Sequence, residues 1–367
     1  MTIKLWRHFD PILVAAALLL TIIGVVMVYA ALSSPKAHAV ALSATLHEAS
    51  YAVLGLLLLV AVCFLDYRVF RTLFWPLFIG NALLLLAVLA AGRASHGAQR
   101  WLSLGFFPFQ PSELGKLLLI LTLAKILADR DQQITKLRIV LLALLIAAIP
   151  AALVYPQPDL GTAVVYLAIW LGMTMAAGMR VRHLALLVVA CAAATPFAMK
   201  LLRGYMLQRL TIFLHPESDP TGAGYNIIQA LIAIGNGGWI GQGFLKGTQS
   251  QLSFLRVGQS DFIFSAIAEQ LGFLGCLLLF GLFALLLTRL LDTAGLAQDL
   301  YGRLVTIGIM WMLLFQMFVN VGMNLQLMPV TGVPLPFISA GGSSLVTSLL
   351  AVGIVQSIRM RQKKIVF

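Results

Sequence analysis

Residues 11–32 read PILVAAALLLTIIGVVMVYAAL, an apolar run that contains no charged side chain. A helix needs about 20 mostly apolar residues to cross the hydrocarbon core of a bilayer, so this run predicts a transmembrane helix. Asp10 before Pro11 favours a helix start here, because aspartate caps the first turn and proline fits its first position. The run is too long for a cleavable signal peptide and no small-residue cleavage site follows it, so we expect a retained span.

The composition of the whole chain points the same way. Of its 367 residues, 60% are hydrophobic and 10% are charged, and the mean hydropathy is +0.97. Soluble domains carry about 25% charged residues, so this chain could not cover the surface of a soluble fold. The net charge of +12 fits basic anchoring to anionic lipid better than binding to nucleic acid. The three cysteines lie inside apolar runs, which argues against a disulfide scaffold.

Ten apolar stretches could be membrane spans. They lie near residues 11–32, 48–66, 72–92, 112–128, 137–155, 159–178, 183–201, 262–288, 303–328 and 343–358. An even number of spans places both termini on one side. Of the 25 basic residues, 16 fall on that side and 8 on the other, so the positive-inside rule makes both termini cytoplasmic. The sequence thus predicts an all-α polytopic membrane protein of about ten transmembrane helices, a single integral membrane domain over residues 1–367.

One large segment, residues 202–260, lies outside the predicted spans and connects the seventh to the eighth. The predicted orientation makes it an extracytoplasmic loop. A structureless loop of this length is unusual unless it is functional. Two apolar stretches within it, residues 205–214 and 225–234, could lie flat on the bilayer as short interfacial helices.

Ionisable side chains at or inside apolar runs are the informative residues of a membrane protein. Glu113 and Lys116 open the fourth span on its outer side and, three residues apart, share one helix face. A structural interpretation has Ser112 capping the helix, Glu113 complementing its dipole and Lys116 pairing with Glu113. Against it, Lys116 lies one turn inside the membrane, where a charge without a function is costly. Both interpretations stay open here.

Two aspartates stand at other outer helix starts. Asp159, within QPDLGT at residues 157–162, is best explained as a helix cap. Asp261, within QSDFIF at residues 259–264, also fits a cap. However, the long loop brings several basic groups to the same surface, and Glu269 follows two turns deeper in the same span. A carboxylate at a partly dry interface binds its proton more tightly, which suits a general base.

The ninth span and the segment after it are also polar. Gln316, Asn320 and Asn324 recur every four residues on one face, and we favour hydrogen bonds between helices as their role. In the following segment, residues 328–344, three prolines forbid a continuous helix. This segment predicts an outer loop that dips back toward the bundle and ends near Ser343, a further candidate for substrate binding.

Several other kinds of site are excluded. The glycines between residues 235 and 243 lack the strand–turn–helix context of a dinucleotide site, and the six histidines lack zinc-ligand spacing. No Ser–His–Asp grouping is legible on one face. No internal repeat, and no matched pair of broken helices, indicates a transporter.

Several motifs together resemble the SEDS family (shape, elongation, division and sporulation). They are HGAQRW at 96–101, QPSELGK at 110–116, QPDLGT at 157–162, HPESDP at 215–220, GAGY at 222–225, GTQS at 247–250 and DFIF at 261–264. Their order and spacing match the family from the first span to the last. Three of these motifs are similar to those of the RodA branch, which serves cell elongation: GAQRW, PESDP and GTQS. The division branch, FtsW, usually has other residues at these places.

The resemblance implies a peptidoglycan glycosyltransferase that polymerises lipid II on the outer face of the bacterial inner membrane. It also implies a class B penicillin-binding protein as transpeptidase partner, with other membrane proteins of the elongation complex. Asp261 matches the essential carboxylate of the family, and Glu113 and Lys116 match functionally important positions. Two residues depart from the family pattern: Gln270 stands where a second glutamate is usual, and Ala340 where tyrosine is frequent.

Polymerisation would join the 4-hydroxyl of one lipid-linked disaccharide to the anomeric carbon of another, releasing the lipid pyrophosphate with inversion. This chemistry needs a base and a cationic cradle for the leaving group. We predict that Asp261 is the base, that Lys116, Arg100 and Arg209 contact the pyrophosphate, that Glu113 orients Lys116, and that Asp159, Glu269 and Ser343 support the site or bind substrate. A phosphate-bound divalent cation, Mg²⁺ or Mn²⁺, would neutralise the same charge, although no ligand cluster in the sequence requires one.

Two other classes of function stay open at this point: a lipid II flippase and a non-catalytic scaffold of the elongation complex. A flippase needs polar groups along its whole path, whereas the polar clusters here gather toward the outer end. A scaffold predicts that substitutions at Asp261 leave polymerisation intact.

Overall fold

Ten long helices in the described part of the chain coincide with the ten predicted stretches. The computed structural model describes residues 6–33, 38–95, 98–104, 107–201, 204–219, 222–252, 254–255 and 257–362. The long helices are α2 (Pro11–Leu32), α3 (His38–Phe64), α5 (Phe74–Ala91), α6 (Pro111–Asp129), α7 (Leu137–Val154), α8 (Leu160–Ala176), α9 (Val181–Leu201), α13 (Ile263–Leu296), α14 (Leu300–Asn324) and α15 (Gly342–Met360), with the short α4 (Arg68–Thr72) and η1 (Asp131–Gln133) between them.

These helices make a multi-pass membrane protein. Among the described residues, α2, α3, α7, α13, α14 and α15 are long and apolar enough to cross a membrane, and α5, α8 and α9 contain shorter apolar helices. The helical fold is therefore confirmed, and the count of ten spans stays a prediction.

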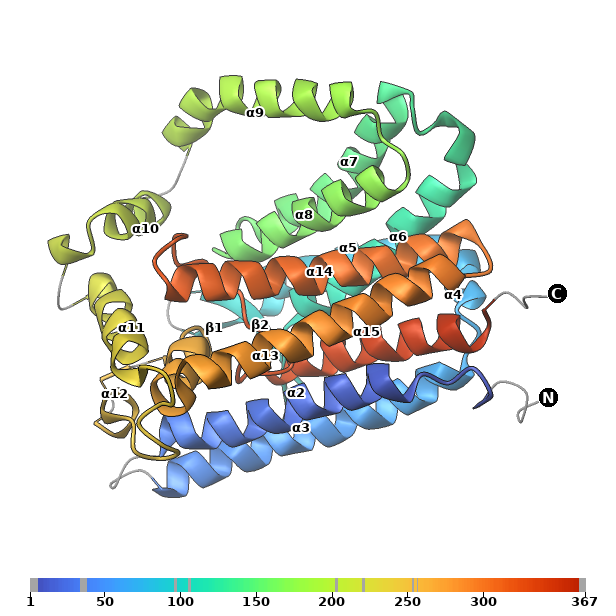
Figure 1. Ribbon diagram of the computed structural model, residues 1–367. Coiled ribbons are helices and arrows are strands. Elements are labelled where there is room, and N and C mark those ends of the chain that lie inside the picture. Colours follow the sequence, from blue (N-terminus) through green and yellow to red (C-terminus); the bar gives the residue numbers. More distant parts are fainter. Residues whose placement is uncertain are drawn as a thin grey trace.

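Most of the long helices run side by side in one bundle (Figure 1). α3 packs along α15, α13 contacts both α2 and α14, and α8 contacts α7 and α14. The interior is close-packed and apolar: Leu20, Ile120 and Leu313 have no exposed surface. α9 stands apart from the bundle in Figure 1, and its Val188 and Val189 are exposed, as suits residues that face lipid.

The two ends of the described chain meet at one end of the bundle (Figure 1). His8 Nδ1 lies 2.8 Å from Gln362 Nε2. Asp10 caps α2 as predicted, accepting from the backbone N–H groups of Ile12 and Leu13, and it pairs with Arg289 at 2.6 Å. This arrangement agrees with an even number of crossings, and the cytoplasmic placement of the termini stays a prediction.

A small β-sheet corrects the expectation that the fold is purely helical. The connection between α5 and α6 forms β1 (Arg93–Ser95), β2 (Ala98–Leu104) and β3 (Phe107–Phe109), antiparallel in the order β1-β2-β3. β1 and β3 have only three residues, and β2, AQRWLSL, does not alternate strictly between apolar and polar side chains, so the sequence lacks the period-two pattern by which a strand is recognised. The sheet matters because β2 carries Arg100 and Trp101 to the end of the bundle where α13 and α15 begin.

The long loop between α9 and α13 is largely helical. It contains α10 (Gly204–Leu214), η2 (Pro216–Ser218), α11 (Ala223–Gly237) and α12 (Thr248–Gln251), so both predicted apolar stretches are helices. α11 packs on α13 and crosses the end of the bundle in Figure 1. Its Ile227, Ala230 and Ala233 are buried against protein, so this helix is held by the fold.

α13 bends sharply where the long loop packs on it. Gly272 has φ +65°, a conformation that residues with a Cβ rarely adopt. A Cβ at Gly272 would lie 2.2 Å from the backbone nitrogen of Gly241. The bend and the close approach of the two backbones therefore both require glycine.

The segment between α14 and α15 dips into the bundle, which confirms the prediction for this proline-containing loop. Val333, Leu335, Phe337 and Ile338 are all buried. Nδ2 of Asn320 donates to the backbone oxygen of Val333 at 2.9 Å, so the polar face of α14 holds the loop.

Candidate active site

Asp261 lies immediately before α13, and α14 holds its backbone in place. The Nδ2 groups of Asn320 and Asn324 donate to the Asp261 carbonyl oxygen at 3.2 Å and 3.0 Å. Asn324 Oδ1 also accepts from the N–H and hydroxyl of Ser265 in the first turn of α13. The polar stripe on the ninth predicted span is therefore an inter-helix hydrogen-bond system, as expected, and its function is to position Asp261.

Asp261 faces a polar cavity of about 210 Å³. The cavity is lined by Arg100, Trp101, Gln110, Arg209, Ser260, Asp261, Gly332, Pro334, Ala340, Gly341 and Ser344. These residues come from β2, the start of α6, α10, the start of α13 and the loop before α15. Five segments that are distant in sequence thus converge on one carboxylate.

The loop before α15 is fixed by hydrogen bonds to the segment that carries Asp261. The Ser339 hydroxyl donates to the Ser260 carbonyl at 2.7 Å and accepts from the Leu335 N–H at 2.8 Å. The Ala340 N–H donates to the Gln259 carbonyl at 2.8 Å. The inward-dipping loop is therefore tied directly to the residues that precede Asp261.

Two arginines bring positive charge to the cavity, and both are held by backbone carbonyls. Arg100 Nε donates to the Gln157 carbonyl at 3.0 Å, and its Nη2 donates to the Pro158 carbonyl. Arg209 Nη1 donates to the Val330 carbonyl at 3.1 Å. The resulting cationic surface adjoins the carboxylate, which is the pattern predicted for a base beside a pyrophosphate site.

The surroundings of Asp261 raise its proton affinity. Burial raises the pKa of Asp261 above its usual range, and the positive charges of Arg209 and Arg100 oppose this rise. The negative charge of Asp159 adds to it. A carboxylate poised in this way can take a proton from a substrate hydroxyl more readily than an exposed aspartate can.

Asp159 caps α8 as predicted and also orients Arg100. Its carboxylate accepts from the Thr162 N–H at 3.2 Å and from the Thr162 hydroxyl at 2.9 Å. Arg100 Nη1 lies 3.9 Å from Asp159 Oδ1, and Gln110 Nε2 lies 3.4 Å from Oδ2. Asp159 is nearly fully buried, so it supports the cavity from behind its wall.

Glu113 and Lys116 form a buried pair beside the cavity. Lys116 Nζ donates to Glu113 Oε2 at 2.7 Å, and both residues are almost fully buried. The pairing within one helix face was predicted. The residues that line the Asp261 cavity do not include Lys116, and the structure places its ammonium against Glu113.

Glu269 lies apart from the Asp261 cavity. Its fully buried carboxylate accepts from the N–H groups of Gln249 and Ser250, at 2.7 Å and 3.3 Å, and from the Ser250 hydroxyl. It therefore anchors α12 to α13. The neighbouring Gln270 accepts from the Leu245 N–H at 3.1 Å, so an amide serves the same local packing where the family usually has glutamate.

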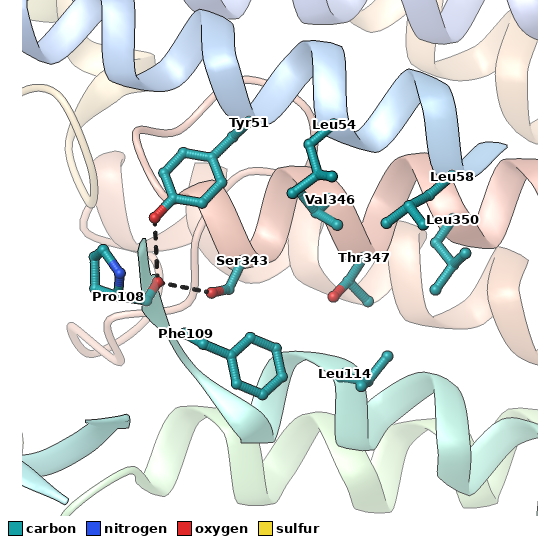
Figure 2. Close-up of a pocket in the computed structure, with 10 residues that line it drawn as sticks. All are labelled: Tyr51, Leu54, Leu58, Pro108, Phe109, Leu114, Ser343, Val346, Thr347 and Leu350. Atoms are coloured by element: carbon teal, nitrogen blue, oxygen red, sulfur yellow. Dashed lines mark hydrogen bonds between the residues drawn. The ribbon is translucent and has the colours of Figure 1, made fainter. Parts of the chain in front are cut away.

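Ser343 borders a second, apolar pocket of about 370 Å³, shown in Figure 2. The pocket is lined by Tyr51, Leu54, Leu58, Pro108, Phe109, Leu114, Ser343, Val346, Thr347 and Leu350. The Ser343 hydroxyl accepts from the Gln110 N–H at 2.9 Å, and the Tyr51 hydroxyl donates to the Pro108 carbonyl. Since Ser344 lines the polar cavity, the first turn of α15 separates the two spaces.

Three residues at this site were not singled out in the sequence. Trp101 and Gln110 line the polar cavity, and both stand inside the motifs that carry the family resemblance. Glu48 is buried in α3, where its Oε1 accepts from the Gly341 N–H at 3.5 Å. Glu48 could have been found in the sequence as an acidic residue at the edge of the second predicted span.

No group of three or more His, Cys, Asp or Glu side chains that could hold a metal ion occurs among the described residues. The divalent cation therefore stays a prediction, and no step proposed below depends on it.

Comparisons with known proteins place this site in context. The family model for FtsW, RodA and SpoVE, described as "Cell cycle protein", matches residues 11–364. Peptidoglycan glycosyltransferase MrdB of Escherichia coli (strain K12) is 40% identical over 357 residues, which cover 97% of this chain and 95% of the relative. Peptidoglycan glycosyltransferase RodA of Treponema pallidum (strain Nichols) is 34% identical over 434 residues, which cover 99% of this chain and 100% of the relative.

Solved structures show the same similarity. One, described as "Structural coordination of polymerization and crosslinking by a peptidoglycan synthase complex", contains a chain 34% identical with a TM-score of 0.82, covering 96% of this chain and 97% of that one. The crystal structure of rod shape determining protein RodA from Thermus thermophilus is 32% identical with a TM-score of 0.73, covering 98% and 99% of the two chains.

Proposed function

The chain belongs to the FtsW, RodA and SpoVE family of cell cycle proteins and is a peptidoglycan glycosyltransferase, and from this premise we propose that it polymerises lipid II at the cavity around Asp261. The proposed setting is the outer face of the bacterial inner membrane during cell elongation. The observation that carries the proposal is one cavity that holds a carboxylate with raised proton affinity beside two fixed arginines.

In the proposed reaction, Asp261 accepts the proton of the acceptor 4-hydroxyl as its oxygen bonds to the anomeric carbon of the donor sugar. The bond between that carbon and the phosphate oxygen breaks, and the lipid pyrophosphate leaves with the electron pair. Attack from the face opposite the leaving group inverts the anomeric carbon. Arg100 and Arg209 stabilise the charge on the departing pyrophosphate, since guanidinium groups match phosphate oxygens in pairs.

The buried pair in α6 makes no direct contact with this cradle. Lys116 is paired with Glu113, and neither residue lines the Asp261 cavity. Replacing one partner would leave the other as an unpaired buried charge, which is strongly destabilising. This cost is the reason that we assign the pair a positioning role and assign the direct contacts to the arginines.

The apolar pocket of Figure 2 supports a lipid-linked substrate. Its walls are mostly leucine, valine and aromatic side chains, and it meets the polar cavity across the first turn of α15. A polyprenyl chain has the chemistry to fill such a pocket while its pyrophosphate reaches the arginines.

The distribution of polar groups favours polymerisation over lipid transport. Asp261, Arg100 and Arg209 line one cavity, and Asp159 lies 3.9 Å from Arg100 at the start of α8, so these charged groups gather at one end of the bundle. A flippase needs such groups along its whole path. The convergence of a base and two arginines on one cavity likewise goes beyond what a scaffold requires.

We further propose that a class B penicillin-binding protein is the partner of this chain. A similar chain occurs in a structure described as a peptidoglycan synthase complex that coordinates polymerization and crosslinking. A transpeptidase partner would crosslink the strands that the proposed active site produces.

The test is to assay purified protein with lipid II and the penicillin-binding partner, comparing wild type with Asp261→Asn. We expect the substitution to reduce glycan polymerisation by at least a hundredfold, because removing a general base typically costs 10²–10⁴-fold. Asp131→Asn, an exposed aspartate in η1, is the matched control and should retain full activity. Unchanged polymer from Asp261→Asn would refute the base assignment, and lipid II transport without polymer by the wild type would favour the flippase.

A further inference from the structure

A second, smaller cavity adjoins the Asp261 site. It has a volume of about 160 Å³ and is lined by Arg209, Ile212, Asn226, Ile227, Val257, Asp261, Phe262 and Val330. Asp261 and Arg209 border both this cavity and the larger polar one. The Asp261 carboxylate therefore borders two cavities and can act on a group bound in either one.

The two spaces differ in chemistry. The larger cavity contains both arginines and the polar loop before α15. The smaller one has mostly apolar walls, formed by side chains such as Ile212, Ile227 and Val330. A flat sugar face packs well on apolar walls of this kind, whereas a pyrophosphate needs the cations of the larger cavity.

Asn226 gives the smaller cavity one polar, uncharged side chain. Its Oδ1 is buried and has no hydrogen-bond partner among the described residues. A buried amide oxygen in this state is unfavourable, and rotation of the amide toward the cavity would let a donor from a ligand satisfy it. A sugar hydroxyl or acetamido N–H supplies such a donor.

Glycosyl transfer by inversion requires the acceptor and the leaving group to lie on opposite sides of the anomeric carbon, with the base next to the acceptor hydroxyl. Resting on the proposed function, we propose that the larger cavity holds the donor pyrophosphate and that the smaller cavity is the acceptor-sugar subsite, with Asn226 as a specificity-determining contact. Asp261 then lies beside the acceptor hydroxyl, and Arg209 faces the junction of both substrates.

The experiment separates the two substrates chemically. A lipid II analogue with a 4-deoxy terminal sugar can act only as donor, and one with a methylene in place of the anomeric oxygen can act only as acceptor. Formation of the tetrasaccharide from the two analogues gives a KM for each. We expect Asn226→Ala to raise the KM of the acceptor about three- to tenfold, the loss from one neutral hydrogen bond, and to leave the KM of the donor within twofold of wild type.

Two further variants keep the test independent of folding. Val257→Phe narrows the smaller cavity from the loop side and should raise the acceptor KM in the same selective way. Asn236→Ala removes an exposed amide from the same helix, outside the cavity, and should change neither KM. A donor KM that rises instead, or two unchanged KM values in Asn226→Ala and Val257→Phe, would overturn the subsite assignment. Failure of the wild type to form any tetrasaccharide would instead count against the proposed function itself.

Discussion

At the scale of single residues, the site is defined by the balance of charges at Asp261. Burial and Asp159 raise the pKa of this carboxylate, while Arg209 and Arg100 lower it. Because the base must be ionised to accept a proton, activity should fall as the pH drops through this raised pKa.

The same raised pKa means that the folded state holds its proton more tightly than the unfolded chain does. Between the two pKa values stability therefore declines as pH rises, and Asp261→Asn should fold at least as stably as wild type at neutral pH.

The pH profile tests this balance through Arg209. Arg209→Gln removes the largest of the charges that lower the pKa of Asp261, so the acidic limb of kcat/KM should move to higher pH. A pH profile of kcat/KM reports the free enzyme and is the measurement to make. Arg303→Gln, an exposed arginine on α14, should leave the limb in place. An acidic limb that does not move in Arg209→Gln would mean that Arg209 does not act on the base.

The predictions for single residues were right where the interacting groups lie within one helical turn of each other in the sequence. The i, i+3 spacing of Glu113 and Lys116 fixes their pairing on one helix face, and the cap at Asp159 follows from its place before α8. The sequence predicts Glu269 at the site because it follows Asp261 in the same apolar span. Its real partners, Gln249 and Ser250, lie about 20 residues earlier, and a contact of that range depends on how α12 folds back on α13.

At the scale of elements, helices were predictable and their irregularities were not. The apolar runs set the positions of the long helices because each must bury about 20 apolar residues in lipid. The three-stranded sheet and the bend in α13 arise from packing at the outer end of the bundle, where no long period marks the sequence. Gly272 is one of four glycines in a helix of 34 residues, so the sequence does not mark it as the bend, and its role depends on the backbone of Gly241 opposite.

Substitution of Gly272 tests how much this bend and the close backbone approach contribute to stability. Gly272→Ala would place a Cβ 2.2 Å from the Gly241 nitrogen at a positive φ, so we expect a loss of about 1–3 kcal/mol in the free energy of unfolding. Gly281→Ala lies in the same helix with nothing within 4 Å of its Cβ and should be neutral or slightly stabilising. Thermal unfolding of the detergent-solubilised proteins compares them. Equal unfolding temperatures would show that the close approach at Gly272 relaxes freely.

At the scale of the whole molecule, the site and the chain ends occupy opposite ends of the bundle. The Asp261 cavity lies where α13 and α15 begin, whereas Figure 1 places both termini at the other end. The distribution of Lys and Arg assigns the termini to the cytoplasm, so the cavity should open on the outer side.

Cysteine labelling of intact cells tests this orientation. In a Cys191→Ser background, which removes the exposed native thiol, a membrane-impermeant maleimide should label Glu217→Cys from outside. Asp131→Cys, in the connection between α6 and α7, should react only after permeabilisation. The opposite pattern would reverse the orientation of the whole protein and move the proposed reaction to the cytoplasmic face.

The way in which the two arginines are held has a consequence for the evolution of this site. Arg100 and Arg209 are oriented by the main-chain oxygens of Gln157, Pro158 and Val330, and every amino acid supplies such an oxygen. The positive charges therefore stay in register with the carboxylate through the course of the main chain. A shift of one residue in either loop would carry the oxygens, and with them the guanidinium groups, out of line, so relatives should keep the lengths of both loops.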